Sequence, residues 1–141
     1  MEYLSFNKGK RREVREKIKQ TLLTRKEIVF AFIFGSFLDS PSFRDIDIGV
    51  YLKSIKKEDI FDYELNLAEK IAKKCHLALD IVEIKVLNFA PSSFLNNIFN
   101  RGQLLFCKNY QLLSDLIENT SLDALANEYI SYQSLKELVP D

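Results

Sequence analysis

The order of apolar and polar positions along the chain predicts a small set of strands separated by turns. Residues 28–34 form a run of seven apolar side chains, IVFAFIF, which is typical of a strand buried on both faces. Gly35 ends this run, where the backbone must turn sharply or come close to another group. Alternating positions predict a second strand that ends near Leu52 and a third at 77–86. A last short strand is predicted at 104–107.

Helical spacing of apolar residues predicts helices in most of the remaining chain. In the first of them, Val14, Ile18 and Leu22 form a stripe between charged residues, and we expect this stripe to pack on the sheet. The predicted helices cover residues 8–25, 59–75, 92–100, 111–118 and 122–139. The polar residues 119–121 are expected to separate the last two.

The last predicted helix carries an apolar seam. Leu122, Leu125, Tyr129 and Tyr132 lie three and four residues apart, so they share one face of that helix. Packing of this seam on its own domain is the simpler interpretation. The alternative is that the seam docks the helix of a partner protein.

Two carboxylates open the second strand. Asp45 and Asp47 are two residues apart, so on a strand both point to the same side. Ile46, Ile48 and Val50 point to the other side, into a core. Two like charges side by side repel each other, and a divalent cation would neutralise both. Because Mg²⁺ prefers carboxylate, water and phosphate oxygens, the pattern predicts a magnesium site.

A third carboxylate, Asp80, lies in the third predicted strand between Leu79 and Ile81. A buried and unpaired carboxylate in such an apolar segment would be costly, so we expect Asp80 to have a partner. That partner is either a nearby Lys or Arg, in a structural role, or a metal ion shared with Asp45 and Asp47.

The turn at Gly35 and Ser36 has two interpretations. It is either a simple turn with a helix cap, or a site where the free amides of a helix start hold an anion. The glycine would let the anion approach the backbone closely.

These motifs, in this order, resemble the DNA polymerase β-type nucleotidyltransferase superfamily. FGSF followed by RDIDIGV is similar to its signature, in which Gly-Ser precedes an Asp-x-Asp strand. Within the superfamily the chain most resembles the minimal nucleotidyltransferases (MNT), the antitoxins of HEPN–MNT toxin–antitoxin pairs. LALDIVEI resembles the later strand that carries the third carboxylate, and NFAPSSFLNNIFNRGQLLFCK resembles the helix and final strand after it. The similarity covers residues 28–108.

The resemblance implies an α/β (α+β) fold, a small mixed sheet flanked by helices. Residues 1–141 would form a single domain with its core at 28–108 and helical extensions at both ends. It also implies a Mg-dependent adenylyltransferase that moves AMP from ATP to a protein hydroxyl. The acceptor would be a tyrosine of a partner HEPN RNase toxin, so that the chain acts as an antitoxin.

The resemblance further implies the role of each site residue. Asp45, Asp47 and Asp80 would hold two Mg²⁺ ions, and Asp80 would also accept the proton of the attacking hydroxyl. Gly35 and Ser36 would hold the triphosphate of ATP.

The loop after Gly-Ser departs from the family pattern. The family usually has an Arg-Gly pair there and about ten residues before the first Asp, whereas this chain has Leu38-Asp39-Ser40-Pro41 and eight intervening residues. Arg44 is the nearest candidate to replace the missing charge. This departure favours an alternative function, an antitoxin that neutralises its toxin by binding without catalysis. Nucleotide transfer to a small molecule is a second alternative, although such enzymes usually carry an additional substrate-binding domain.

Composition places the chain among ordinary soluble proteins. Its 141 residues suit one domain, and 47% hydrophobic with 28% charged residues is typical of a globular protein and not of a disordered one. No apolar run approaches the roughly 18 residues that span a bilayer. The first residues have no apolar signal-peptide core, so we expect a cytoplasmic location and no membrane partner.

Net charge is zero but unevenly distributed, which bears on partners. Residues 8–26 contain nine Lys or Arg against two Glu, and residues 111–141 contain six Asp or Glu against one Lys. Solvated helix faces or a charged partner would explain this. The balanced net charge argues against direct nucleic-acid binding. The sequence leaves open whether the chain forms a homo- or hetero-oligomer.

Overall fold

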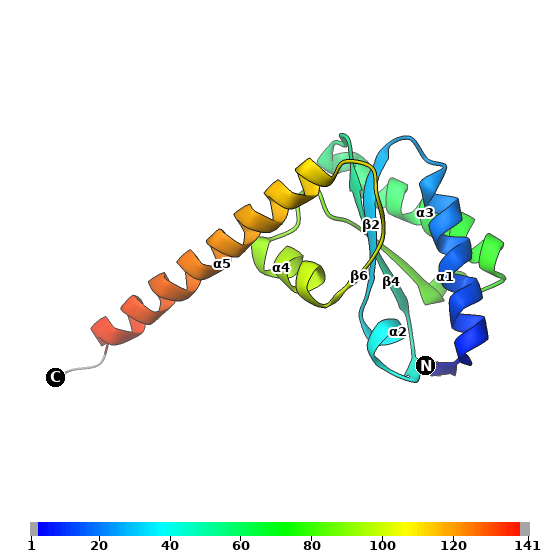
Figure 1. Ribbon diagram of the computed structural model, residues 1–141, viewed down its shortest axis with the longest axis horizontal. Coiled ribbons are helices and arrows are strands. Elements are labelled where there is room, and N and C mark those ends of the chain that lie inside the picture. Colours follow the sequence, from blue (N-terminus) through cyan, green and yellow to red (C-terminus); the bar gives the residue numbers. More distant parts are fainter. Residues whose placement is uncertain (1–2, 139–141) are drawn as a thin grey trace.

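The computed structural model describes residues 3–138 and has a central sheet with helices on both faces (Figure 1). The strands are β1 (Leu4–Ser5), β2 (Ile28–Phe34), β3 (Ser42–Phe43), β4 (Ile46–Leu52), β5 (Val82–Val86) and β6 (Gln103–Cys107). The helices are α1 (Lys8–Leu23), α2 (Ser36–Asp39), α3 (Ile60–Cys75), α4 (Ser92–Arg101) and α5 (Tyr110–Leu138), with short 3₁₀ helices η1 (Lys57–Asp59) and η2 (Leu79–Ile81).

The main sheet has four strands in the order β5-β4-β2-β6. Strand β2 pairs antiparallel with β4 and with β6, whereas β4 and β5 are parallel. The predicted fold, a small mixed sheet flanked by helices, is therefore confirmed. A separate two-residue ladder joins β1 to β3, with Leu4 opposite Phe43, and so ties the start of the chain to the segment just before β4.

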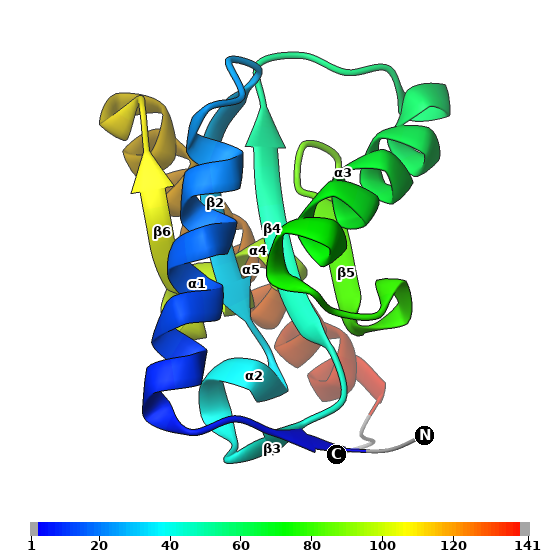
Figure 2. The same ribbon diagram turned by 90° about the vertical axis from the view of Figure 1, so that its right-hand side faces the viewer.

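Helices cover both faces of this sheet, which explains the uninterrupted apolar run of β2. Figure 2 shows α1 and α3 in front of the sheet and α4 and α5 behind it. Ala31 and Ile33 belong to the core under α1 and α3, while Phe30 and Phe32 belong to the core under α4 and α5. The predicted strand with both faces buried is confirmed.

The structure corrects the start of the third predicted strand. Residues 79–81 form η2, and the strand begins only at Val82. Asp80 is exposed, so the expectation that it is a buried carboxylate is wrong. Leu79 is also 43% exposed, which shows that an apolar neighbour in the sequence did not mean an apolar environment.

The structure also corrects the C-terminal end, where one helix replaces the predicted pair. Helix α5 runs without a break through residues 119–121. The Thr120 hydroxyl donates hydrogen bonds to the carbonyls of Leu116 and Ile117, one turn earlier. Since Thr can satisfy its hydroxyl inside a helix in this way, the polar tripeptide does not end the helix.

Most of the apolar seam on α5 is exposed. Leu122, Leu125 and Tyr129 are 58%, 62% and 65% exposed, and α5 extends away from the body of the domain (Figure 1). Packing on its own domain is therefore the wrong interpretation for these three residues. The side chain of the fourth member, Tyr132, lies outside the part that the structure describes. Over residues 3–138, no helix is long and apolar enough to cross a membrane.

Two truncations on α5 test this division between a buried start and an exposed end. Leu113 is buried in the core under α4 and α5, so Leu113→Ala should lower the free energy of unfolding by about 3 kcal/mol. Leu125→Ala removes the same atoms from an exposed position and should change the free energy of unfolding by less than about 0.5 kcal/mol. Urea unfolding of the isolated protein measures both. If both variants lowered the free energy of unfolding by similar amounts, the apolar seam would be covered in solution.

Candidate functional site

Three carboxylates meet at one end of the sheet, where β2 ends and β4 and β5 begin. Asp45 directly precedes β4, Asp47 is its second residue, and Glu83 is the second residue of β5. One carboxylate oxygen of each lies within 4.8 Å of those of the other two. Asp45 and Asp47 are thus brought together as predicted, and Glu83 joins them.

Strand pairing explains why Glu83 takes this place. In the parallel ladder of β4 and β5, Asp47 lies opposite Glu83. Residues that face each other across a ladder project to the same side of the sheet. The neighbours Ile46, Ile48 and Val82 alternate with these two carboxylates and are buried.

The three like charges affect the ionisation of Asp47. Burial, followed by the negative charges of Glu83 and Asp45, raises the pKa of Asp47 from 3.8 to about 6. The positive charge of Lys85 acts in the opposite direction and lowers this pKa. Within residues 3–138, none of the three carboxylates forms an ion pair with a Lys or Arg. Among the described residues, direct ion pairs therefore do not balance the charges of this group.

The donor set fits a hard divalent cation. All three groups offer carboxylate oxygens, which Mg²⁺ and Mn²⁺ prefer to nitrogen or sulfur. Asp45 and Asp47 are half-buried while Glu83 is exposed, so one side of the group is open to a ligand.

Gly35 brings the turn after β2 directly against Asp47. Its φ is +82°, in the region that favours glycine, and a Cβ there would lie 2.2 Å from Oδ2 of Asp47. Any other residue would displace that carboxylate. Ser36 follows as the exposed first residue of α2, so the predicted Gly-Ser pair lies beside the carboxylates.

Asp80 does not belong to this group of carboxylates. It lies on η2, ahead of β5, with its side chain exposed. Sequence reasoning missed Glu83, although the alternation of VEIKV placed it on the polar face of the strand. The assignment of the third carboxylate to Asp80 remains a prediction, and the geometry offers Glu83 in its place.

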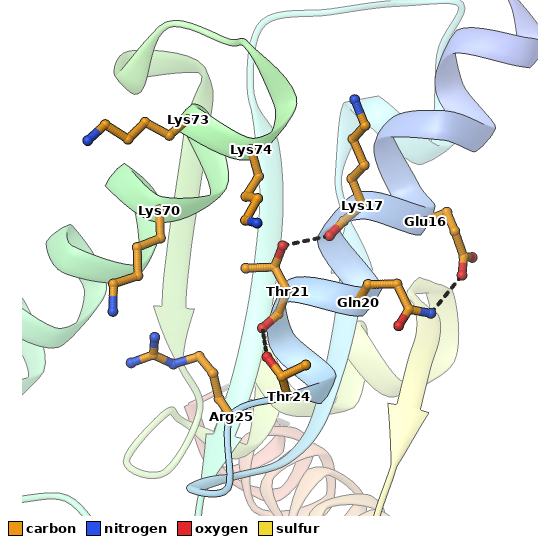
Figure 3. A pocket seen from close by; sticks show the side chains of 9 residues that line it. All are labelled: Glu16, Lys17, Gln20, Thr21, Thr24, Arg25, Lys70, Lys73 and Lys74. Atoms are coloured by element: carbon orange, nitrogen blue, oxygen red, sulfur yellow. Dashed lines mark hydrogen bonds between the residues drawn. The ribbon is translucent and has the colours of Figure 1, made fainter.

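Two hollows of the surface lie elsewhere, one between α1 and α3 and the other along α3 and the segment that follows it. One of about 750 Å³ is lined mainly by cationic side chains and is drawn in Figure 3. Its five cations are Lys17, Arg25, Lys70, Lys73 and Lys74. A second hollow of about 840 Å³ shares Arg25, Lys70 and Lys73 with it. Neither is lined by the carboxylates or by the Gly-Ser turn, so both are separate from the candidate site.

A protein-family model matches the greater part of the chain. The model described as "Polymerase beta, Nucleotidyltransferase" matches residues 16–111, which include Gly35, Ser36 and all three carboxylates of the group. Comparison with curated proteins found no significant match.

Solved structures of toxin–antitoxin complexes contain chains with a similar fold. One is the complex of a tri-AMPylated Shewanella oneidensis HEPN toxin with an MNT antitoxin, with a TM-score of 0.63 and 18% identity over 90% of this chain and 96% of that one. A second, the toxin–antitoxin MntA–HepT, has a TM-score of 0.61 and 17% identity over 89% and 96%. A third, a toxin–antitoxin with AMP-PNP, has a TM-score of 0.64 and 19% identity over 87% and 95%. At such low identity these similarities establish the fold.

The raised pKa of Asp47 makes a prediction about stability in metal-free protein. The folded state holds the Asp47 proton more tightly than the unfolded chain does, so this contribution favours folding at low pH and is lost as the pH rises through about 6. Asp47→Asn should therefore stabilise the EDTA-treated protein at pH 8 by about 1 kcal/mol, a value reduced because solvent screens a half-exposed carboxylate. The gain should disappear near pH 4.

Thermal unfolding at pH 8 and pH 4 measures this difference. Asp80→Asn is the matched control, because it removes the same charge from an exposed position outside the group and should give no such gain. A destabilising effect of Asp47→Asn at pH 8 would contradict the account of mutual repulsion.

Proposed function

Because this chain belongs to the polymerase beta nucleotidyltransferase family, whose model matches residues 16–111, we propose that it transfers AMP from ATP to a hydroxyl group of a partner protein. The observation that carries this proposal is the group formed by Asp45, Asp47 and Glu83, placed against the turn at Gly35. A nucleotide needs both parts, a cation site for its phosphate charge and a backbone turn that its phosphates can approach.

The three carboxylates would hold Mg²⁺. The ion would neutralise charge on the α-phosphate and on the departing pyrophosphate, as it does in phosphoryl transfer generally. Asp45 and Asp47 have the better-defined positions for this role, because both are half-buried and Asp47 is fixed against Gly35. The fit with an all-oxygen donor set supports this assignment.

The remaining roles belong to the turn and to the exposed carboxylate. The backbone at Gly35 and the Ser36 hydroxyl would hold the β- and γ-phosphates. The acceptor oxygen would bond to the α-phosphorus as the bond to pyrophosphate breaks. Its proton would pass to Glu83, the open member of the group, in the role that the sequence prediction gave to Asp80.

The partner we propose is a HEPN toxin, and the acceptor is a tyrosine hydroxyl on it. Chains of similar fold occur in complexes with such toxins, one of which is tri-AMPylated. In this chain, Leu122, Leu125 and Tyr129 form an exposed apolar surface on α5. Such a seam suits the apolar face of a helical partner.

Neutralisation by binding alone is the alternative that a specific observation favours. The exposed seam on α5 would support a stable complex whether or not the site is active. The loop between Ser36 and Asp45 is also short compared with the family pattern. Binding of ATP discriminates between the two functions, since an antitoxin that only occludes its toxin does not need a nucleotide.

Intact-mass spectrometry of the protein encoded next to this one tests the proposed function. After incubation with this chain, ATP and Mg²⁺, the partner should gain mass in steps of one AMP. Asp45→Asn together with Asp47→Asn should reduce this gain by at least about 1,000-fold, because both metal ligands are lost. A stable complex that never gains AMP would instead establish the function by binding.

A matched pair of variants in the same assay identifies the third carboxylate. Glu83→Gln should slow transfer by at least about 100-fold, the usual contribution of a positioned proton acceptor or metal ligand. Asp80→Asn, which removes an exposed charge outside the group, should leave the rate within about twofold. The reverse result would return the third carboxylate to Asp80.

A further inference from the structure

Arg11, in the first turns of α1, makes the most extensive polar contacts with the loop that follows Gly35. Its Nη1 donates a hydrogen bond to the carbonyl of Phe37. Its Nη2 donates to the carbonyls of Ser40 at 2.7 Å and Pro41 at 2.6 Å. Its Nε donates to the carbonyl of Phe6 at 3.2 Å. One side chain from the start of the chain thus connects three carbonyls of a loop about 30 residues later.

The aromatic surroundings fix the plane of this guanidinium. It lies over the ring of Phe37 at 5.0 Å and over the ring of Phe43 at 5.2 Å. These two rings contact each other edge to face at 4.8 Å, and Phe6 contacts Phe43 in the same way at 5.0 Å. Phe37 and Phe43 are buried, so Arg11 connects the loop backbone to a packed part of the core.

The loop needs such support because it has little of its own. Helix α2 has only four residues, far fewer than a helix needs to be stable alone. The carbonyls that Arg11 binds lie in and just after α2, where helical carbonyls lack partners along the chain. Residues 36–43 contain no Lys or Arg, so their cation comes from α1.

The contacts also show what Arg11 does not do. Four of its five N–H groups donate to backbone carbonyls, and over residues 3–138 Arg11 makes no hydrogen bond or ion pair with the three carboxylates. A role in binding phosphate directly would need those donors. Arg11 therefore acts through the loop backbone.

We propose that Arg11 is a positioning residue for the nucleotide: it fixes residues 36–41 so that the turn at Gly35 and Ser36 stays against Asp47. The inference rests on the proposed function. The ladder between β1 and β3 and the Ser5 hydroxyl, which donates to the carbonyl of Pro41 at 3.4 Å, support the same loop. The first residues of the chain thus support the nucleotide site without supplying a group that binds the nucleotide.

Three variants separate positioning from charge and from stability. Arg11→Ala removes the contacts with the loop. Arg11→Lys keeps the charge but lacks the planar fork that reaches Phe37 from one nitrogen and Ser40 and Pro41 from another. Arg12→Ala is the matched control, because Arg12 is exposed on the next position of α1.

The measurements are the Michaelis constant for ATP, kcat for AMP transfer to the partner, and the affinity for Mn²⁺ alone. We expect Arg11→Ala to raise the Michaelis constant at least about tenfold with a smaller effect on kcat, and Arg11→Lys to fall between it and the wild type. The affinity for Mn²⁺ should stay within about twofold in each, since the carboxylates remain. Arg12→Ala should match the wild type.

Several results would overturn the inference. A Michaelis constant for Arg11→Ala equal to that of Arg12→Ala, with only the unfolding temperature lowered, would make Arg11 purely structural. Full activity of Arg11→Lys would show that charge alone matters, and that variant decides the question if Arg11→Ala does not fold. A wild-type protein that binds no ATP would refute the proposed function, whereas the other two results leave that function intact.

Discussion

The repulsion among Asp45, Asp47 and Glu83 is the constraint on which the rest of the site depends. The sheet holds one oxygen of each within 4.8 Å of the others. Burial adds to the free-energy cost of ionising Asp47, as its raised pKa shows. Such an arrangement lowers the stability of the metal-free protein. It becomes favourable when a divalent cation binds, because one ion then interacts with all three charges.

The fold holds the charges together by packing both faces of the sheet. The cores under α1 and α3 and under α4 and α5 fix β2 and β4, and the parallel ladder fixes Glu83 opposite Asp47. Gly35 then brings the following turn against Asp47, and Arg11 secures the loop beyond it. Each part of the site therefore depends on a contact between segments distant in the sequence.

Local patterns predicted much of this arrangement. The apolar run of β2, the paired Asp45 and Asp47, and the Gly-Ser turn were all identified because each is a pattern of adjacent residues in the sequence. Glu83 was missed because its place depends on the register between two strands, which composition does not determine. Asp80 was expected to be buried because its neighbours are apolar, but a 3₁₀ helix exposes it. The polar residues 119–121 were expected to end a helix, but α5 continues through them, with the Thr120 hydroxyl bonded to carbonyls one turn earlier.

The most direct test of the account is the position of a bound ion. Crystals grown with Mn²⁺ and a non-hydrolysable ATP analogue, measured near the manganese absorption edge, would locate it by anomalous scattering. The account predicts a peak within coordination distance of Asp45, Asp47 and Glu83, with the phosphates beside Gly35. A bound nucleotide without an ion at these carboxylates, or an ion held by Asp80 in place of Glu83, would contradict it.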